Sequence, residues 1–86
     1  MLNGRRSNIQ IIAEILRLEE AGKTEIMYSV NMSYAQLEKY LNFLVERGFL
    51  VKTNGTRPVT YRTTAKGKKL LRSIDRIMEA LGMETL

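Results

Sequence analysis

Residues 24–48 read TEIMYSVNMSYAQLEKYLNFLVERG, and this stretch decides the fold. We predict a short helix over about 25–30, opened by Thr24, and a break at Asn31, because Asn tolerates turn conformations. Ser33 then starts a second helix that Gly48 ends, and Ser33-x-x-Gln36 matches the capping box. Its apolar side chains fall on one side of a helical wheel: Leu37, Leu41, Leu44 and Val45. Two helices joined by so tight a turn have helix-turn-helix spacing.

Two β-prone runs follow the second helix. Residues 49–53 and 59–63 flank Asn54-Gly55, the strongest short turn signal, so we predict a hairpin whose tip carries Arg57. Thr64 caps a last helix over about 65–81, in which apolar residues have heptad spacing: Leu70, Ile74, Ile77 and Leu81. The spacing lasts only about two heptads, so by itself it is a weak coiled-coil signal.

A first helix precedes this region. Ser7 can cap it, and we expect it to run to about Ala21, with Gly22 as a left-handed cap. Its apolar side chains form two stripes, one of Ile9, Ile12, Ala13 and Leu16 and the other of Ile11, Ile15 and Leu18. Such a helix is either covered by the C-terminal helix or part of a subunit interface, and we predict the interface. The dimerisation residues would be Ile11, Ile15, Leu18, Leu70, Ile74, Ile77, Met78 and Leu81.

The order of these elements predicts the fold class, mainly α with a small β-hairpin. Helix, short helix, turn, helix, hairpin and helix make a winged helix-turn-helix followed by a C-terminal dimerisation helix. Residues 1–64 would form the DNA-binding domain and residues 65–86 the dimerisation helix, in one compact unit. A helix about 10–12 Å across fits the major groove of B-DNA, which is about 12 Å wide.

Composition excludes several functions for this 86-residue chain. Without Cys or His it has no disulfide, no thiolate zinc site, no thiol nucleophile and no imidazole base. We therefore expect no enzyme, no metal and no cofactor. No run approaches 18 consecutive apolar residues, and the N-terminus has no stretch of the signal-peptide type. We expect a cytoplasmic, nucleoid-associated protein without a membrane partner.

The positive charge is concentrated in the second half of the chain. Fourteen Lys and Arg against nine Asp and Glu give a net charge of +5. Residues 52–76 contain one acidic side chain, Asp75, and eight basic ones: Lys52, Arg57, Arg62, Lys66, Lys68, Lys69, Arg72 and Arg76. A segment this basic favours an acidic partner, and the phosphates of double-stranded DNA are the commonest one.

Several segments resemble a known family: Lys23-Thr24-Glu25-Ile26-Met27-Tyr28, Asn31-Met32-Ser33-Tyr34, Gln36-Leu37, Tyr40-Leu41, Leu44, Gly48-Phe49-Leu50 and Thr64-x-x-Gly67. Over about residues 7–82 the chain is similar to small archaeal winged helix-turn-helix proteins, which include transcription regulators and crenarchaeal chromatin-type DNA-binding proteins. The resemblance implies double-stranded DNA binding and a homodimer built through the C-terminal helix, often as an antiparallel coiled coil. The last helix looks short, which favours a compact dimer that also uses the first helix.

Recognition helices read bases near their N-terminal end, which selects the candidate contact residues. The candidates are Ser33, Tyr34, Gln36 and Lys39 on the helix, and Lys52, Asn54, Thr56, Arg57 and Arg62 on the hairpin. Gln36 can pair with adenine or complete the capping box, but it cannot do both well. With many cations and one plausible base reader, we expect affinity to come mostly from phosphate contacts.

Two alternatives stay open. The main one to a DNA-binding regulator or nucleoid architectural protein is a winged-helix module for protein–protein interaction, which would use Phe43 and the second stripe of the first helix. The basic segment 52–76 argues against it, because a module that binds proteins has no need of such a concentrated positive charge. The sequence neither supports nor excludes a small-molecule effector.

Overall fold

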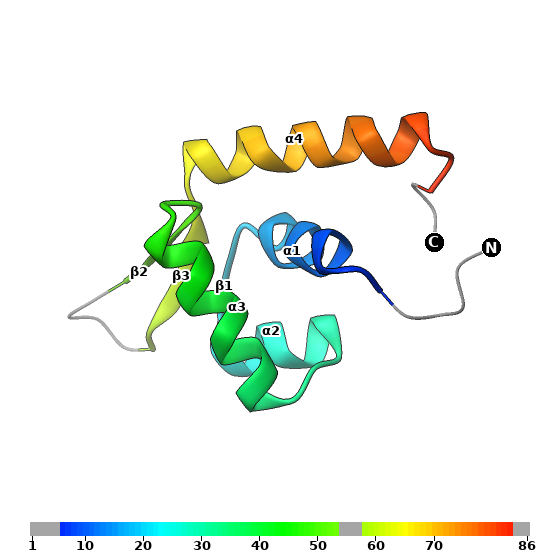
Figure 1. Cartoon of the computed structure of the whole chain (residues 1–86). Coiled ribbons are helices and arrows are strands. Elements are labelled where there is room, and N and C mark those ends of the chain that lie inside the picture. Colours follow the sequence, from blue (N-terminus) through cyan, green and yellow to red (C-terminus); the bar gives the residue numbers. More distant parts are fainter. Residues whose placement is uncertain (1–5, 54–57, 84–86) are drawn as a thin grey trace.

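The computed structural model describes residues 6–53 and 58–83, which fold into four helices and a three-stranded antiparallel sheet (Figure 1). This arrangement confirms the expected fold class. The elements are α1 (Asn8–Arg17), β1 (Glu20–Gly22), α2 (Lys23–Val30), α3 (Tyr34–Glu46), β2 (Leu50–Lys52), β3 (Thr60–Thr63) and α4 (Ala65–Ala80). Asn54, Thr56 and Arg57 lie outside the described residues.

Polar caps begin three of the helices, as expected. The Ser7 hydroxyl accepts a hydrogen bond from the Gln10 amide at 3.1 Å, and the Gln10 side chain accepts one from the Ser7 amide at 2.7 Å. Ser33 and Thr64 cap α3 and α4 through their hydroxyls alone, which accept hydrogen bonds from the Gln36 and Gly67 amides. These hydrogen bonds satisfy backbone donors that the first helical turn leaves unpaired. The short helix α2 differs from the prediction, because it begins at Lys23 after Gly22 and has no side-chain cap.

The end of α1 was predicted wrongly. The helix ends at Arg17 rather than near Ala21, and Glu19 takes the left-handed conformation, with φ of 67°, that was expected of Gly22. The next three residues form β1, which pairs with β3 in the register Ala21 to Tyr61. Ala21 is buried there, so a tertiary contact outweighs the weak strand propensity of Glu, Ala and Gly.

The sheet has the order β1–β3–β2, with β3 in the centre. Tyr61 and Thr63 of β3 are buried, while Arg62 between them is exposed on the opposite face. The Thr63 hydroxyl donates a 2.8 Å hydrogen bond to the Leu16 carbonyl, which joins the sheet to α1. The wing is therefore fixed to the helical core at the base of β3.

The core lies between α1, α2, α3 and the inner face of the sheet. Leu37, Leu41 and Leu44 of α3 are fully buried, which confirms the predicted leucine stripe. They pack in one cluster with apolar side chains of the other elements, among them Ile15, Leu16, Ile26, Val30, Leu50 and Tyr61. Burying a large aliphatic side chain contributes about 1.5–3 kcal/mol, so this stripe fixes which face of α3 points outward.

The helix α4 packs against α1 and lies alongside it (Figure 1). Two predicted dimerisation residues are consequently in the core of the protomer: Ile15 is 2% exposed and Ile74 is 6% exposed. Neither has surface to offer a partner, so their assignment to a dimer interface is corrected. The reason is that Ile15 packs in the core cluster and that α4, which carries Ile74, packs against α1 within one chain. Ile77 and Leu81 remain exposed, while the others are half-buried: Ile11, Leu18, Leu70 and Met78.

Candidate nucleic-acid interface

The helix α3 presents one polar face to solvent. This outward face consists of Tyr34, Gln36, Lys39, Asn42 and Phe43, which are all exposed on the side away from the buried leucines. Amide, hydroxyl and ammonium groups on one side of a helix are the groups that hydrogen-bond base edges and phosphates. The structure therefore brings together the four candidates predicted at the start of this helix, since Ser33 is its N-cap.

Ser33 and Gln36 form only half of a capping box. The Ser33 hydroxyl accepts from the Gln36 amide at 3.3 Å and donates to the Gln36 side-chain carbonyl at 3.2 Å. The Gln36 side chain thus binds the Ser33 hydroxyl, whereas a full capping box would have it bind the Ser33 backbone N–H. Within the described part of the chain, the side-chain NH₂ of Gln36 has no hydrogen-bond partner. That donor is free to reach a base edge.

Tyr34 is positioned by a residue that sequence reasoning missed, Lys23 at the start of α2. The Lys23 ammonium donates to the Tyr34 hydroxyl at 3.1 Å and lies 4.7 Å from the centre of its ring. It also forms an ion pair with Glu38 at 2.5 Å. The hydrogen bond to Glu38, and then the one to Tyr34, raise the pKa of Lys23 well above its ordinary value. No sequence periodicity links position 23 to positions 34 and 38, because the contact crosses the turn between two helices.

Lys39 occupies the centre of the outward face. It is exposed, and it belongs to none of the ion pairs that residues 6–53 and 58–83 form. Phe43, one turn further along, is 41% exposed and has the Arg47 guanidinium 4.9 Å above its ring. Among the described residues, the outward face thus has one cation outside any ion pair near its middle and another over an aromatic ring near its end.

The two described candidates of the wing lie on different strands. Lys52 on β2 is exposed, and its ammonium lies 5.9 Å from the centre of the Tyr61 ring. Arg62 is exposed on β3, where its cross-strand neighbours are Glu20 and Val51. The Thr53 amide donates to the Thr60 carbonyl at 2.8 Å, and the Thr60 amide donates to the Thr53 hydroxyl at 2.9 Å, which closes the base of the hairpin. The remaining wing candidates, Asn54, Thr56 and Arg57, lie outside the described residues.

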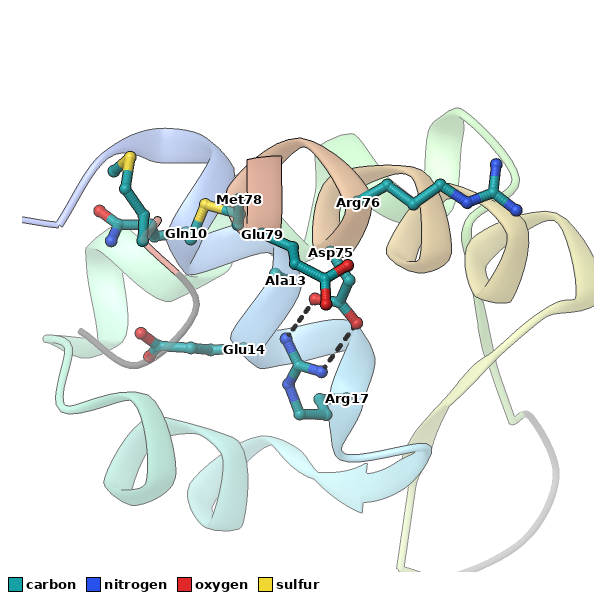
Figure 2. Close-up of a pocket in the computed structure, with 9 residues that line it drawn as sticks. Gln10, Ala13, Glu14, Arg17, Asp75, Arg76, Met78 and Glu79 are labelled. Atoms are coloured by element: carbon teal, nitrogen blue, oxygen red, sulfur yellow. Dashed lines mark hydrogen bonds and ion pairs between the residues drawn. The ribbon is translucent and has the colours of Figure 1, made fainter. Parts of the chain in front are cut away.

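A cavity of about 470 Å³ lies between α1 and α4, on a side of the molecule where acidic and basic groups mix (Figure 2). Glu14 and Arg17 contribute to it from α1, and Asp75 and Glu79 from α4. The Arg17 guanidinium bonds both oxygens of Asp75 there. In the described ranges, no group of acidic side chains could hold a metal ion, and no helix is long and apolar enough to cross a membrane.

Comparison with known proteins identifies relatives by sequence. Two proteins of Methanocaldococcus jannaschii are each 34% identical over 80 residues, which is 90% of this chain. They are the uncharacterized proteins MJ0287 and MJ0290, of which the chain spans 78% and 36% respectively.

Solved structures share the fold. Sso10a-2, a DNA-binding protein from Sulfolobus solfataricus, has a TM-score of 0.81 and 29% identity, with 90% of this chain and 83% of that chain covered. NadR in complex with 4-hydroxyphenylacetate has a TM-score of 0.64 and 25% identity, with 91% of this chain and 64% of that chain covered. The family model for winged helix-turn-helix proteins matches residues 5–81. With the helix-turn-helix, the wing and the matched sequence in agreement, the chain belongs to the winged helix-turn-helix family.

Proposed function

We propose that this protein binds double-stranded DNA as a homodimer and acts as a transcription regulator or a nucleoid architectural protein. In this proposal α3 enters the major groove with its N-terminal half, and the wing lies on the neighbouring phosphate backbone. The observation that carries it is the outward face of α3. Its leucines are fully buried, while Tyr34, Gln36 and Lys39 are exposed in the N-terminal half of the helix.

The contacts divide by role. The Gln36 side chain, whose amide donor has no partner among the described residues, is the candidate for reading a base, because Gln pairs with adenine through two hydrogen bonds. Lys39, Lys52 and Arg62 are candidates for phosphate contacts, which give affinity without sequence information. Glu20 lies opposite Arg62 on the neighbouring strand and weakens the positive potential there, so we expect Arg62 to contribute less to DNA affinity than Lys39.

The relatives support the same proposal. Sso10a-2 is described as a DNA-binding protein, and it matches this chain over most of both lengths. The basic segment 52–76 includes β3 and most of α4. Its positive electrostatic potential attracts a polyanion such as DNA. The homodimer is supported by exposed apolar residues on α4: Ile77 is 57% exposed and Leu81 is 66% exposed.

Fluorescence anisotropy with a labelled duplex, measured over a range of salt concentrations, tests the proposal. If each protomer neutralises about four phosphates, a dimer engages about eight, and the slope of log K against log salt should be near −7. Absence of binding at low salt would refute DNA binding and favour the protein-interaction module. Competition with random DNA separates the two roles, since a regulator should prefer its operator by about 10³ or more.

A further inference from the structure

A second cationic surface lies along α4. A groove of about 450 Å³ is lined by four basic side chains: Lys66, Lys69, Arg72 and Arg76. We call it the basic groove. Ser73 adds a hydroxyl, while Phe49 and Leu70 provide apolar contact. The four cations span ten residues of a helix that rises about 1.5 Å per residue, so they extend along about 15 Å.

The charge of the basic groove is not neutralised by neighbouring acids. None of its described lining residues is acidic. The acidic residues of α4, Asp75 and Glu79, instead line the cavity toward α1, where Asp75 binds Arg17 (Figure 2). Arg76 lines both this cavity and the basic groove, and Figure 2 shows its guanidinium directed away from the ion pair of Arg17 and Asp75. The helix therefore separates its charges, with the acids near α1 and a row of cations on another side.

One cation of the groove is used inside the protein. Lys66 donates a 2.8 Å hydrogen bond to the Arg47 carbonyl, and its ammonium lies 4.9 Å from the centre of the Phe49 ring. Lys69, Arg72 and Arg76 are exposed, and they occur in no ion pair of the described chain. Three exposed cations in a row beside a hydrogen-bonded one suit a linear polyanion better than a compact anion, because a compact ion would meet only one or two of them.

The groove lies at the opposite end of α3 from the proposed DNA-reading residues. In Figure 1, α3 runs from the turn after α2 toward the start of α4. Its 13 residues correspond to about 20 Å. The basic groove begins beside the end of this helix, where Lys66 binds the Arg47 carbonyl, so most of the length of α3 separates it from the residues proposed to read DNA.

From this arrangement we propose that the basic groove binds the phosphate backbone of a second DNA duplex, so that the protein joins two duplexes. The joining of two duplexes rests on the proposed function of α3, whereas the binding of a duplex to the basic groove does not. Each cation that contacts a phosphate should add about 0.9 to the magnitude of the salt slope of this second binding step.

Nuclear magnetic resonance titration of the ¹⁵N-labelled full chain with a short duplex tests the proposal. We expect amide signals of α3 to shift and saturate first, and signals of residues 69–76 to keep shifting as more duplex is added. Unchanged signals for residues 69–76 would overturn the proposal. Simultaneous saturation of both sets would also overturn it, because one bent duplex would then reach both surfaces. Shifts in 69–76 without any in α3 would refute the proposed function and the joining of two duplexes together.

A pair of variants separates the groove from general charge. The single variants Lys69→Gln and Arg76→Gln should each lower the affinity of the basic groove for the second duplex about eightfold at 0.1 M salt. The affinity of α3 for the first duplex should stay unchanged. Lys68→Gln is the matched control, because Lys68 is exposed next to Lys69 but does not line the groove. Equal effects of Lys68→Gln and Lys69→Gln would overturn the proposal. A parallel titration with polyglutamate covers an acidic protein partner: shifts of 69–76 with polyglutamate but not with duplex would overturn it as well.

Discussion

Arg17 and Asp75 form a two-pronged ion pair between positions 58 residues apart in the sequence, with N–O distances of 2.9 and 3.1 Å (Figure 2). The pair joins the last turn of α1 to the middle of α4. Both side chains are about half exposed, at 56% and 46%, so solvent screens the interaction. Its value lies in position, because it holds the helix with the basic groove in one orientation on the core.

Asp75→Asn should lower the free energy of unfolding by about 0.5 kcal/mol at pH 7, as expected for an exposed ion pair. The hydrogen bond from Arg17 lowers the pKa of Asp75 below its ordinary value. The stability contributed by the pair is therefore fully present above the unfolded-state pKa, near 3.9, and is lost as the pH falls through the lower folded-state pKa. Urea unfolding of both proteins between pH 7 and pH 2 measures this difference.

The control for this prediction is Glu79→Gln. Glu79 lies one helical turn after Asp75 and lines the same cavity, but it forms no ion pair within the described residues. We expect Glu79→Gln to leave the stability unchanged at every pH. A loss equal to that of Asp75→Asn, or a difference between Asp75→Asn and wild type that persists at the lowest pH, would contradict the role of the pair.

Gly67→Ala should destabilise the protein by about 2 kcal/mol, although Ala is favoured over Gly in helices by about 1 kcal/mol. A Cβ at this position would lie 2.2 Å from the Phe49 carbonyl oxygen and 2.8 Å from a methyl carbon of Thr63. The absent side chain lets α4 approach the start of β2 closely. Ser73→Ala, at an exposed position of the same helix, should be neutral or slightly stabilising in the same urea experiment. A stabilised Gly67→Ala would contradict the close approach.

Local signals account for most of what the sequence predicted. Ser7, Ser33 and Thr64 bind backbone amides within their own helical turns, so a few adjacent residues suffice to find those caps. The buried leucines of α3 repeat with the helical period, which located its outward face. The strand β1 and the position of Lys23 depend on contacts between segments far apart in the sequence. For the same reason, periodicity placed Ile15 on an outer stripe, although it packs in the core cluster.

Ile77→Glu should convert the proposed dimer into a monomer. Ile77 is 57% exposed on α4, and a carboxylate buried between two copies would lose its hydration without gaining a partner. Sedimentation velocity at several protein concentrations gives the mass. Tyr28→Glu, an exposed aromatic on α2 at 77% exposure, is the control and should leave the dimer intact. A dimer that persists in Ile77→Glu would place the interface elsewhere.

Lys39→Gln should weaken DNA binding to all sequences alike and make the salt slope less steep by about 0.9 for each protomer. The reason is that Lys39 is the exposed cation near the middle of the outward face of α3. Anisotropy titrations at several salt concentrations measure the slope. Glu46→Gln, at the far end of the same helix, removes a charge of the opposite sign and should not make the slope less steep. An unchanged slope in Lys39→Gln would remove this residue from the phosphate contacts.

Lys23→Met and Tyr34→Phe distinguish a structural from a DNA-binding role of the contact between α2 and α3. Lys23→Met removes both the ion pair with Glu38 and the hydrogen bond to Tyr34, so it should lower stability by about 0.5–1 kcal/mol and also weaken DNA binding. Tyr34→Phe keeps the ring beneath the Lys23 ammonium and the ion pair, so its stability should stay close to wild type.

If the Tyr34 hydroxyl contacts a phosphate, Tyr34→Phe loses DNA affinity without losing stability. Urea unfolding and anisotropy, measured on the same preparations, give the two quantities independently. Wild-type affinity in Tyr34→Phe would show that the hydroxyl serves only Lys23. Wild-type affinity in Lys23→Met would show that the recognition helix does not need its link to α2, because the buried leucines alone would then orient it.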